Sequence, residues 1–245
     1  PLLTRRRIAG AGNESLPMAL QLHIGNKNYS SWSMRPWVLM RELGIAFDEV
    51  ALRFDFGEGS AFRQAVARVS PARRVPVLVD DGLSVWDTLA IAEYLHEQFP
   101  GAGVWPKEAR ERARARCLSA EMHSGFGALR QNCGMNIEAS LPEVGRRLWA
   151  EQPEVRADVA RIEQMWTEQL ATSGGPMLFG AFGAADAFYA PVCMRLHTYA
   201  LPLGAPAAAY VQRVRQVPGV KAWIDAALAE QDFLDFEEPY RKARS

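Results

Sequence analysis

The hydrophobic pattern changes its period several times between residues 18 and 99. Short apolar runs bounded by turn residues predict strands near 19–24 and 45–52, and two more within 75–86 that are joined by the Asp81–Gly82 turn. Helical spacing predicts helices over 34–43 and 87–99, and residues 56–69 form a loop that leads into an irregular helix. The predicted order is therefore β-α-β-α-β-β-α.

The pattern becomes entirely helical after a segment rich in proline and glycine at 100–107, which marks a linker. Long helical periodicities follow at 108–133, 142–171 with an interruption at Pro153, 184–200, 206–216 and 218–230. The sequence thus predicts an α/β domain at 18–99 and an all-α domain at 108–245.

Composition narrows the classes of partner. The 28 basic and 28 acidic side chains cancel, so we expect neither nucleic acid nor a membrane as partner, and a small molecule or a protein instead. The four histidines are scattered, which predicts no metal site, and the three cysteines lack CxxC spacing, as in a reducing compartment such as the cytoplasm. Residues 1–17 are expected to be a disordered or expression-derived extension.

The segment YSSWSMRPW, residues 29–37, joins the first predicted strand to the first helix. Its serines, Ser30, Ser31 and Ser33, either cap the helix or donate a hydrogen bond to a bound thiolate. The unsatisfied N–H groups of a helix N-terminus favour negative charge there, and Arg35 either assists ionisation or pairs with a carboxylate elsewhere.

A second motif lies in RRVPVLVDDGLSVWDTLAIAEYL, residues 73–95. A cis bond between Val75 and Pro76 would leave the Val75 main chain available to pair with an extended peptide. Asp87 and Thr88 open the next helix and offer a carboxylate and a hydroxyl to a ligand's ammonium and carboxylate groups. The two motifs together predict a pocket for a small peptide that has charged ends and a thiol.

These elements resemble the soluble glutathione transferases over residues 18–235. The resemblance implies a thioredoxin-like domain that binds glutathione as co-substrate, a helical domain that binds a small electrophile, and a homodimer. SSWSMR is similar to the SSCSWR-type motif of the zeta class, which includes maleylacetoacetate isomerases, and implies Ser30 as the residue that activates the thiol. Other serine-type classes favour Ser31, and Trp32 stands where the zeta class has cysteine, so conjugation and isomerisation both remain open.

Two segments of the helical domain extend the resemblance. In GAADA, Gly183 and Asp186 match a capping box, which gives Asp186 a role in stability. Residues 121–137 resemble a stretch of a bacterial branch of the family, so His123, Arg130 and Asn136 either contact the electrophile or glutathione, or form an interhelical or dimer-interface hydrogen bond.

The tryptophans of the serine motif have separate expected places, with Trp32 in the pocket wall and Trp37 in the core.

The leading interpretation is a glutathione transferase. The alternative is a binding or regulatory module with the same fold and no turnover, because a fold does not establish an activity. A serine hydrolase is disfavoured because the chain lacks a G-x-S-x-G motif.

Overall fold

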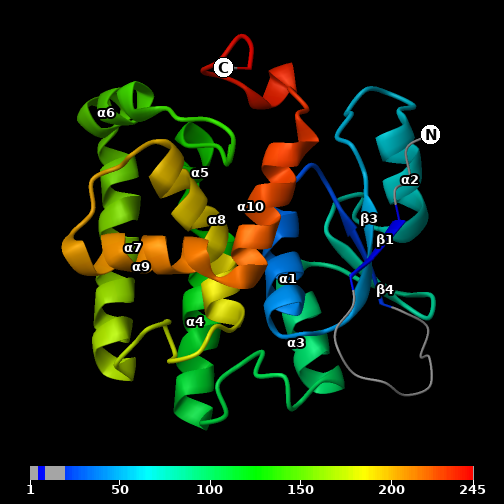
Figure 1. Cartoon of the computed structure of the whole chain (residues 1–245), viewed down its shortest axis with the longest axis horizontal. Helices are drawn as coiled ribbons and strands as arrows, with labels where there is room; N and C mark the ends of the chain where they lie inside the picture. The colour runs from blue at the N-terminus through cyan, green and yellow to red at the C-terminus, as the bar shows by residue number, and fades with distance from the viewer. Residues whose placement is uncertain (1–4, 9–19, 245) are drawn as a thin grey trace.

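The computed structural model describes residues 5–8 and 20–244, which form an α/β domain beside a helical domain (Figure 1). The sheet has the strand order β1-β3-β2-β4-β5. Strands β2 and β3 are parallel, whereas β2–β4 and β4–β5 pair antiparallel. The strands are β1 (Arg5–Ile8), β2 (Gln21–Ile24), β3 (Phe47–Ala51), β4 (Val77–Asp80) and β5 (Leu83–Val85).

Strand β1 differs from the expectation for residues 1–17. Residues 5–8 pair antiparallel with β3, because an edge strand leaves a row of backbone N–H and C=O groups that another extended segment can satisfy. The rest of that range, residues 1–4 and 9–17, lies outside the described residues, as does Met18.

Three helices complete the α/β domain: α1 (Ser31–Glu42), α2 (Ala61–Val69) and α3 (Thr88–Gln98). From β2 to α3 the order is the predicted β-α-β-α-β-β-α. Apolar side chains from the strands and from α1 and α3 form one core, in which Leu22, Ile24, Val38, Leu78 and Ile91 are fully buried. The sheet therefore fixes α1 and α3 on a common apolar surface.

The second domain is built from helices joined by loops, with isolated β-bridges at 177–181 in its described part. Its helices are α4 (Ala109–Ser124), α5 (Gly127–Asn132), α6 (Pro142–Glu151), α7 (Pro153–Ser173), α8 (Ala184–Thr198), α9 (Ala205–Gln216) and α10 (Pro218–Glu230), followed by a short 3-10 turn, η1 (Asp235–Glu237). The break at Pro153 was predicted. The predicted helix 108–133 is instead two helices, because Phe126 adopts a left-handed conformation with φ of 58°.

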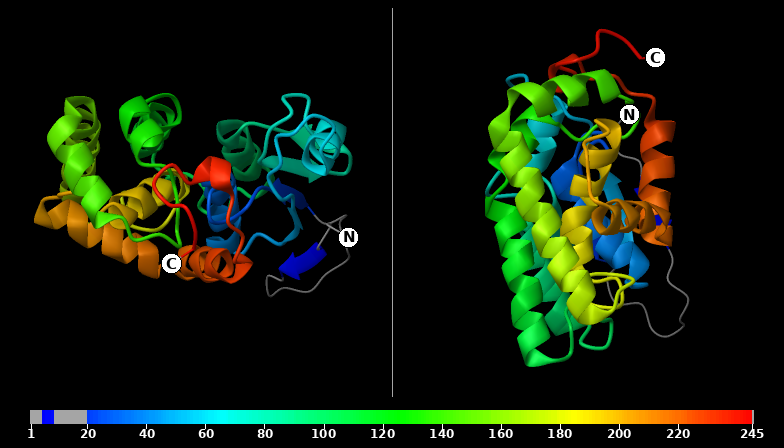
Figure 2. Two further views of the ribbon diagram at one scale, coloured as in Figure 1. Left: turned by 90° about the horizontal axis from the view of Figure 1, so that it is seen from above. Right: turned by 90° about the vertical axis from the view of Figure 1, so that its left-hand side faces the viewer.

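Helix α8 runs through the middle of the helical domain and packs against α1 of the α/β domain. All but one of its residues are buried, and a continuous hydrophobic core extends from the sheet through α1 into the helical domain. Figure 2 shows the two domains side by side, with α1 between the sheet and the helices. The N-terminal end of α1 thereby faces both domains.

No helix in the described part of the chain has both the length and the apolar character needed to cross a membrane.

Asp186 anchors the start of α8, in agreement with its predicted role. Its carboxylate is fully buried and accepts hydrogen bonds from the Leu178 N–H (3.0 Å), the Gly183 N–H (3.1 Å) and the Tyr210 hydroxyl (2.7 Å). Burial raises the pKa of Asp186 to about 6. Since three donors, two of them in buried hydrogen bonds, depend on this one side chain, it holds the loop before α8 to α9.

We predict that Asp186→Ala lowers the free energy of unfolding by about 3 kcal/mol, because it leaves buried donors unpaired. Urea denaturation followed by circular dichroism measures the change. Asp225→Ala is the matched control, because Asp225 forms an exposed ion pair with Lys221 that contributes well under about 1 kcal/mol. Equal effects of the two substitutions would contradict the role assigned to Asp186.

Candidate functional site

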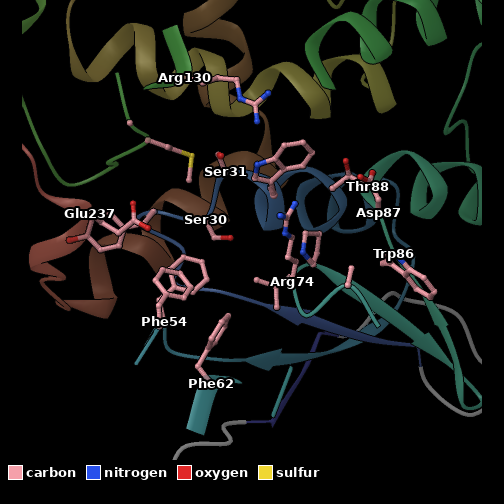
Figure 3. A pocket seen from close by; sticks show the side chains of 18 of the residues that line it. Ser30, Ser31, Phe54, Phe62, Arg74, Trp86, Asp87, Thr88, Arg130 and Glu237 are labelled. Carbon is pink, nitrogen blue, oxygen red and sulfur yellow. The ribbon is translucent and has the colours of Figure 1, made fainter. Parts of the chain in front are cut away.

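A cavity of about 550 Å³ lies where the two domains meet. One wall comes from the α/β domain: the start of α1, the loop before β4 and the start of α3. The other comes from α5, α8 and the C-terminal segment, residues 231–244, which follows α10 (Figure 3). The lining residues are Tyr29, Ser30, Ser31, Trp32, Phe54, Phe56, Phe62, Ala72, Arg73, Arg74, Val75, Pro76, Trp86, Asp87, Thr88, Arg130, Gly134, Met135, Arg195 and Glu237.

Two serine hydroxyls reach this cavity from the N-terminal end of α1. Ser30 is the N-cap residue, and its Oγ lies 2.7 Å from the Oγ of Ser33, which also accepts from the Gly25 N–H at 3.1 Å. Ser31 is the first helical residue, and its Oγ accepts from the guanidinium of Arg195 at 3.1 Å. Both hydroxyls are thus held by buried partners at a point where the helix dipole favours negative charge.

The loop before β4 forms the next part of the wall. The Val75–Pro76 bond is cis, as the sequence predicted, and both residues line the cavity. The ladder between β4 and β2 begins at Val77, so Val75 lies beyond it. This edge of the backbone is placed where an extended ligand can pair with it.

Asp87 and Thr88 form the start of α3 beside the same cavity. Asp87 caps the helix by accepting from the Leu89 N–H at 3.1 Å, and its other oxygen lies 3.2 Å from Nε2 of His123. The Thr88 Oγ1 lies 3.5 Å from both Arg35 and His123. Burial lowers the pKa of His123, and nearby Asp87 only partly opposes this, so the imidazole is neutral near pH 7.

Three arginines give the site a positive potential. Arg35 and Arg195 are almost completely buried, and burial together with repulsion from Arg130 lowers the pKa of Arg35 to about 9 and of Arg195 to about 10. The Arg35 guanidinium lies 4.1 Å from the ring of Trp32, and that of Arg130 lies 5.0 Å from it. None of the three takes part in an ion pair among the described residues. Such a wall is complementary to an anion.

Most of the site residues predicted from the sequence come together here. Eight of them line the cavity directly: Ser30, Ser31, Trp32, Val75, Pro76, Asp87, Thr88 and Arg130. Ser33, Arg35 and His123 lie behind this wall and contact its members. Trp37 is buried in the core, as expected.

Asn136 lies elsewhere, away from the cavity lining. It is buried, accepts from the Asn28 side chain at 3.0 Å and donates to Glu238 at 2.8 Å. These contacts favour a structural hydrogen bond over contact with the substrates, but the bonds join loop segments and not two helices as the interhelical interpretation expected.

Sequence reasoning missed several residues of the lining. Phe54, Phe56 and Phe62 form an aromatic cluster on the α/β side, with ring centroids 5.3–5.5 Å apart. Arg195 arrives from α8, far along the chain. Glu237 comes from the C-terminal tail FLDFEEPYRKARS, whose packing was expected to shape the pocket, although no single residue of it was named. One signal was present: Arg195 is a charged residue within the otherwise apolar run FYAPVCMRL, and a buried cation needs a specific partner.

The C-terminal segment closes one end of the cavity. Glu238 accepts from the Tyr29 hydroxyl at 2.7 Å and forms an ion pair with Arg241, and Leu234 is buried against the α/β domain. Phe236 packs against Phe56 with ring centroids 5.2 Å apart. These contacts hold Glu237 at the cavity.

Among the described residues, no group of three or more histidine, cysteine, aspartate or glutamate side chains is placed to hold a metal ion.

Comparison with known proteins identifies the architecture of both domains. The model of the glutathione S-transferase N-terminal domain matches residues 29–98, and that of the glutathione S-transferase C-terminal domain matches residues 108–226. A solved glutathione transferase homologue from Burkholderia, with bound glutathione, superimposes with a TM-score of 0.61 at 23% identity, covering 85% of this chain and 97% of that one.

Curated relatives match over shorter stretches. The dichloromethane dehalogenase of Methylorubrum extorquens is 38% identical over 78 residues, which are 31% of this chain and 26% of that protein. The maleylacetoacetate isomerase of Rattus norvegicus is 28% identical over 123 residues, or 50% of this chain and 56% of the relative. The matches therefore span between about a quarter and just over half the length of these two relatives.

Proposed function

Because this chain belongs to the glutathione S-transferase family, we propose that it binds glutathione in the interdomain cavity and activates its thiol to attack a small electrophile. One observation carries the proposal. The hydroxyls of Ser30 and Ser31 stand at the N-terminal end of α1, beside a cavity whose opposite wall is cationic. This arrangement favours a thiolate at that point.

The proposed position of glutathione follows from the chemistry of the cavity wall. Its ammonium group is complementary to the Asp87 carboxylate, and its glutamyl carboxylate to the Thr88 hydroxyl and the N–H groups at the start of α3. Its extended main chain pairs with Val75. The cysteinyl thiol then extends toward Ser30 and Ser31.

Thiol activation of this kind needs only a modest stabilisation. Lowering the pKa of a thiol by about two units requires roughly 2.7 kcal/mol of preference for the thiolate. A hydrogen bond from a serine hydroxyl to the charged sulfur supplies about 1.5–3 kcal/mol, and the end of α1 adds about 0.3–1 kcal/mol. In this proposal one of the two serines, Ser30 or Ser31, acts as a donor to the sulfur and not as a nucleophile.

The reaction that follows is either conjugation or a glutathione-dependent isomerisation. Both begin with attack of the thiolate on an electrophilic carbon, and the similarity to a dehalogenase and to a maleylacetoacetate isomerase supports each. The aromatic wall of Phe54, Phe56 and Phe62 supports a partly apolar electrophile. A homodimer and a cytoplasmic location stay predictions from the resemblance and the cysteine pattern.

The proposal is tested by titrating the protein with glutathione in a calorimeter while recording the ultraviolet absorbance of the thiolate near pH 7. We expect saturable binding together with a thiolate signal at a pH where free glutathione is mostly protonated. Binding without that signal would indicate a carrier or regulatory module. The absence of binding would refute the proposed function.

We predict that Asp87→Asn weakens glutathione binding about tenfold to a hundredfold, because it removes a charged hydrogen bond of about 1.5–3 kcal/mol. Asparagine still caps α3, so the fold is preserved. The calorimetric dissociation constant measures the effect. Asp225→Asn, on the exposed face of α10, is the control, and an unchanged dissociation constant in Asp87→Asn would remove Asp87 from the proposed site.

A further inference from the structure

The two serines at the cavity differ in the partner behind them. The neighbour of Ser30 is the neutral hydroxyl of Ser33, at 2.7 Å. The neighbour of Ser31 is the guanidinium of Arg195, at 3.1 Å. Whichever hydroxyl donates in the Ser30–Ser33 pair, that pair carries no charge, whereas Ser31 is joined to a cation.

Arg195 is held rigidly for this contact. It projects from α8 and is 6% exposed, and its NH1 group donates to the carbonyl oxygens of Arg130 and Cys133. Those carbonyls belong to α5 and its C-terminal end. Its NH2 group is left to reach across the domain boundary to Ser31. The planar guanidinium therefore has its orientation fixed by the helical domain.

The direction of this hydrogen bond determines what Ser31 can do. A guanidinium has donors and no acceptor, so the Ser31 oxygen must accept. The hydroxyl proton of Ser31 then points away from Arg195, and Ser31 lines the cavity. A donor that is itself hydrogen-bonded to a cation is polarised and becomes a stronger donor to an anion.

We infer that Ser31 is the hydroxyl that donates to the glutathione thiolate and that Arg195 is its positioning residue. The inference rests on the proposed function and deepens it. Arg195 orients the Ser31 oxygen and strengthens its O–H group as a donor, while Ser30 shapes the end of α1 through Ser33. The helical domain thus takes part in activating a thiol bound by the α/β domain.

The test measures the pKa of the bound glutathione thiol by ultraviolet titration, together with the pH profile of kcat/KM for a chlorodinitrobenzene. We expect Arg195→Met and Ser31→Ala each to raise the thiol pKa by about one unit, equivalent to losing part of one charged hydrogen bond. The lower limb of the pH profile should shift by the same amount. Ser30→Ala should have a clearly smaller effect.

A double variant separates positioning from a direct effect of charge. If Arg195 acts through Ser31, then Arg195→Met adds almost nothing to the thiol pKa in the Ser31→Ala background. An equal rise in both backgrounds would overturn the inference, because Arg195 would then act on the thiolate directly. A larger effect of Ser30→Ala than of Ser31→Ala would also overturn it.

Trp223→Phe is the matched control for a loosened domain interface. Trp223 is fully buried in α10 and donates to the Lys27 carbonyl across the same boundary at 3.0 Å, and it forms no hydrogen bond with Ser30 or Ser31. It should leave the thiol pKa unchanged, and a shift as large as that of Arg195→Met would overturn the inference.

Arg195→Lys provides the conservative variant, and it carries the comparison if Arg195→Met does not fold. Lysine keeps the charge but lacks the planar guanidinium that donates to two carbonyls and to Ser31 at once. We therefore expect a thiol pKa between those of the wild type and Arg195→Met. A wild-type value in Arg195→Lys would overturn the positioning role. Failure of the wild-type protein to bind glutathione would contradict the proposed function itself, which is a distinct result.

Discussion

The packing of α1 against α8 is the contact on which the rest of the structure depends. Helix α1 belongs to the α/β domain, yet its other face is covered by α8 and α10 of the helical domain. Because the buried side chains of both helices form one continuous core, the two domains cannot shift independently without exposing apolar surface. The N-terminal end of α1 is thereby held at the boundary, and Ser30 and Ser31 are held with it.

This constraint also brings buried positive charge to the cavity. Burial removes the hydration of a guanidinium and requires other polar groups to replace it. Arg195 receives two backbone carbonyls and the Ser31 oxygen, and Arg35 receives the faces of Trp32 and Phe188. These partners are neutral, so the site keeps a net attraction for an anion. The low exposure of both arginines limits screening by solvent and salt, which makes that attraction stronger than it would be on the surface.

Local signals in the sequence were sufficient for the fold and for half of the site. The order of elements and the break at Pro153 follow from periodicity and from proline and glycine. Ser31, Val75 and Asp87 lie at or next to the ends of helices and strands, where capping residues and proline mark the boundaries in the sequence itself. The separation of α4 from α5 was missed, because it depends on Phe126 adopting a left-handed conformation, which a non-glycine residue seldom does.

The other half of the site depends on tertiary packing. No local pattern in the sequence indicates which distant residues lie next to each other there. Arg195 lies 164 positions from Ser31 along the chain, and Glu238 lies 209 positions from Tyr29. The aromatic cluster belongs to the same domain as the serine motif, but only the fold brings its rings to the cavity. Each domain alone holds an incomplete site: the α/β domain has hydroxyls without a cation behind Ser31, and the helical domain has a cation without a ligand to act on. The chemistry proposed for this cavity is therefore a property of the docked pair of domains, and the core between α1 and α8 is what couples folding to function.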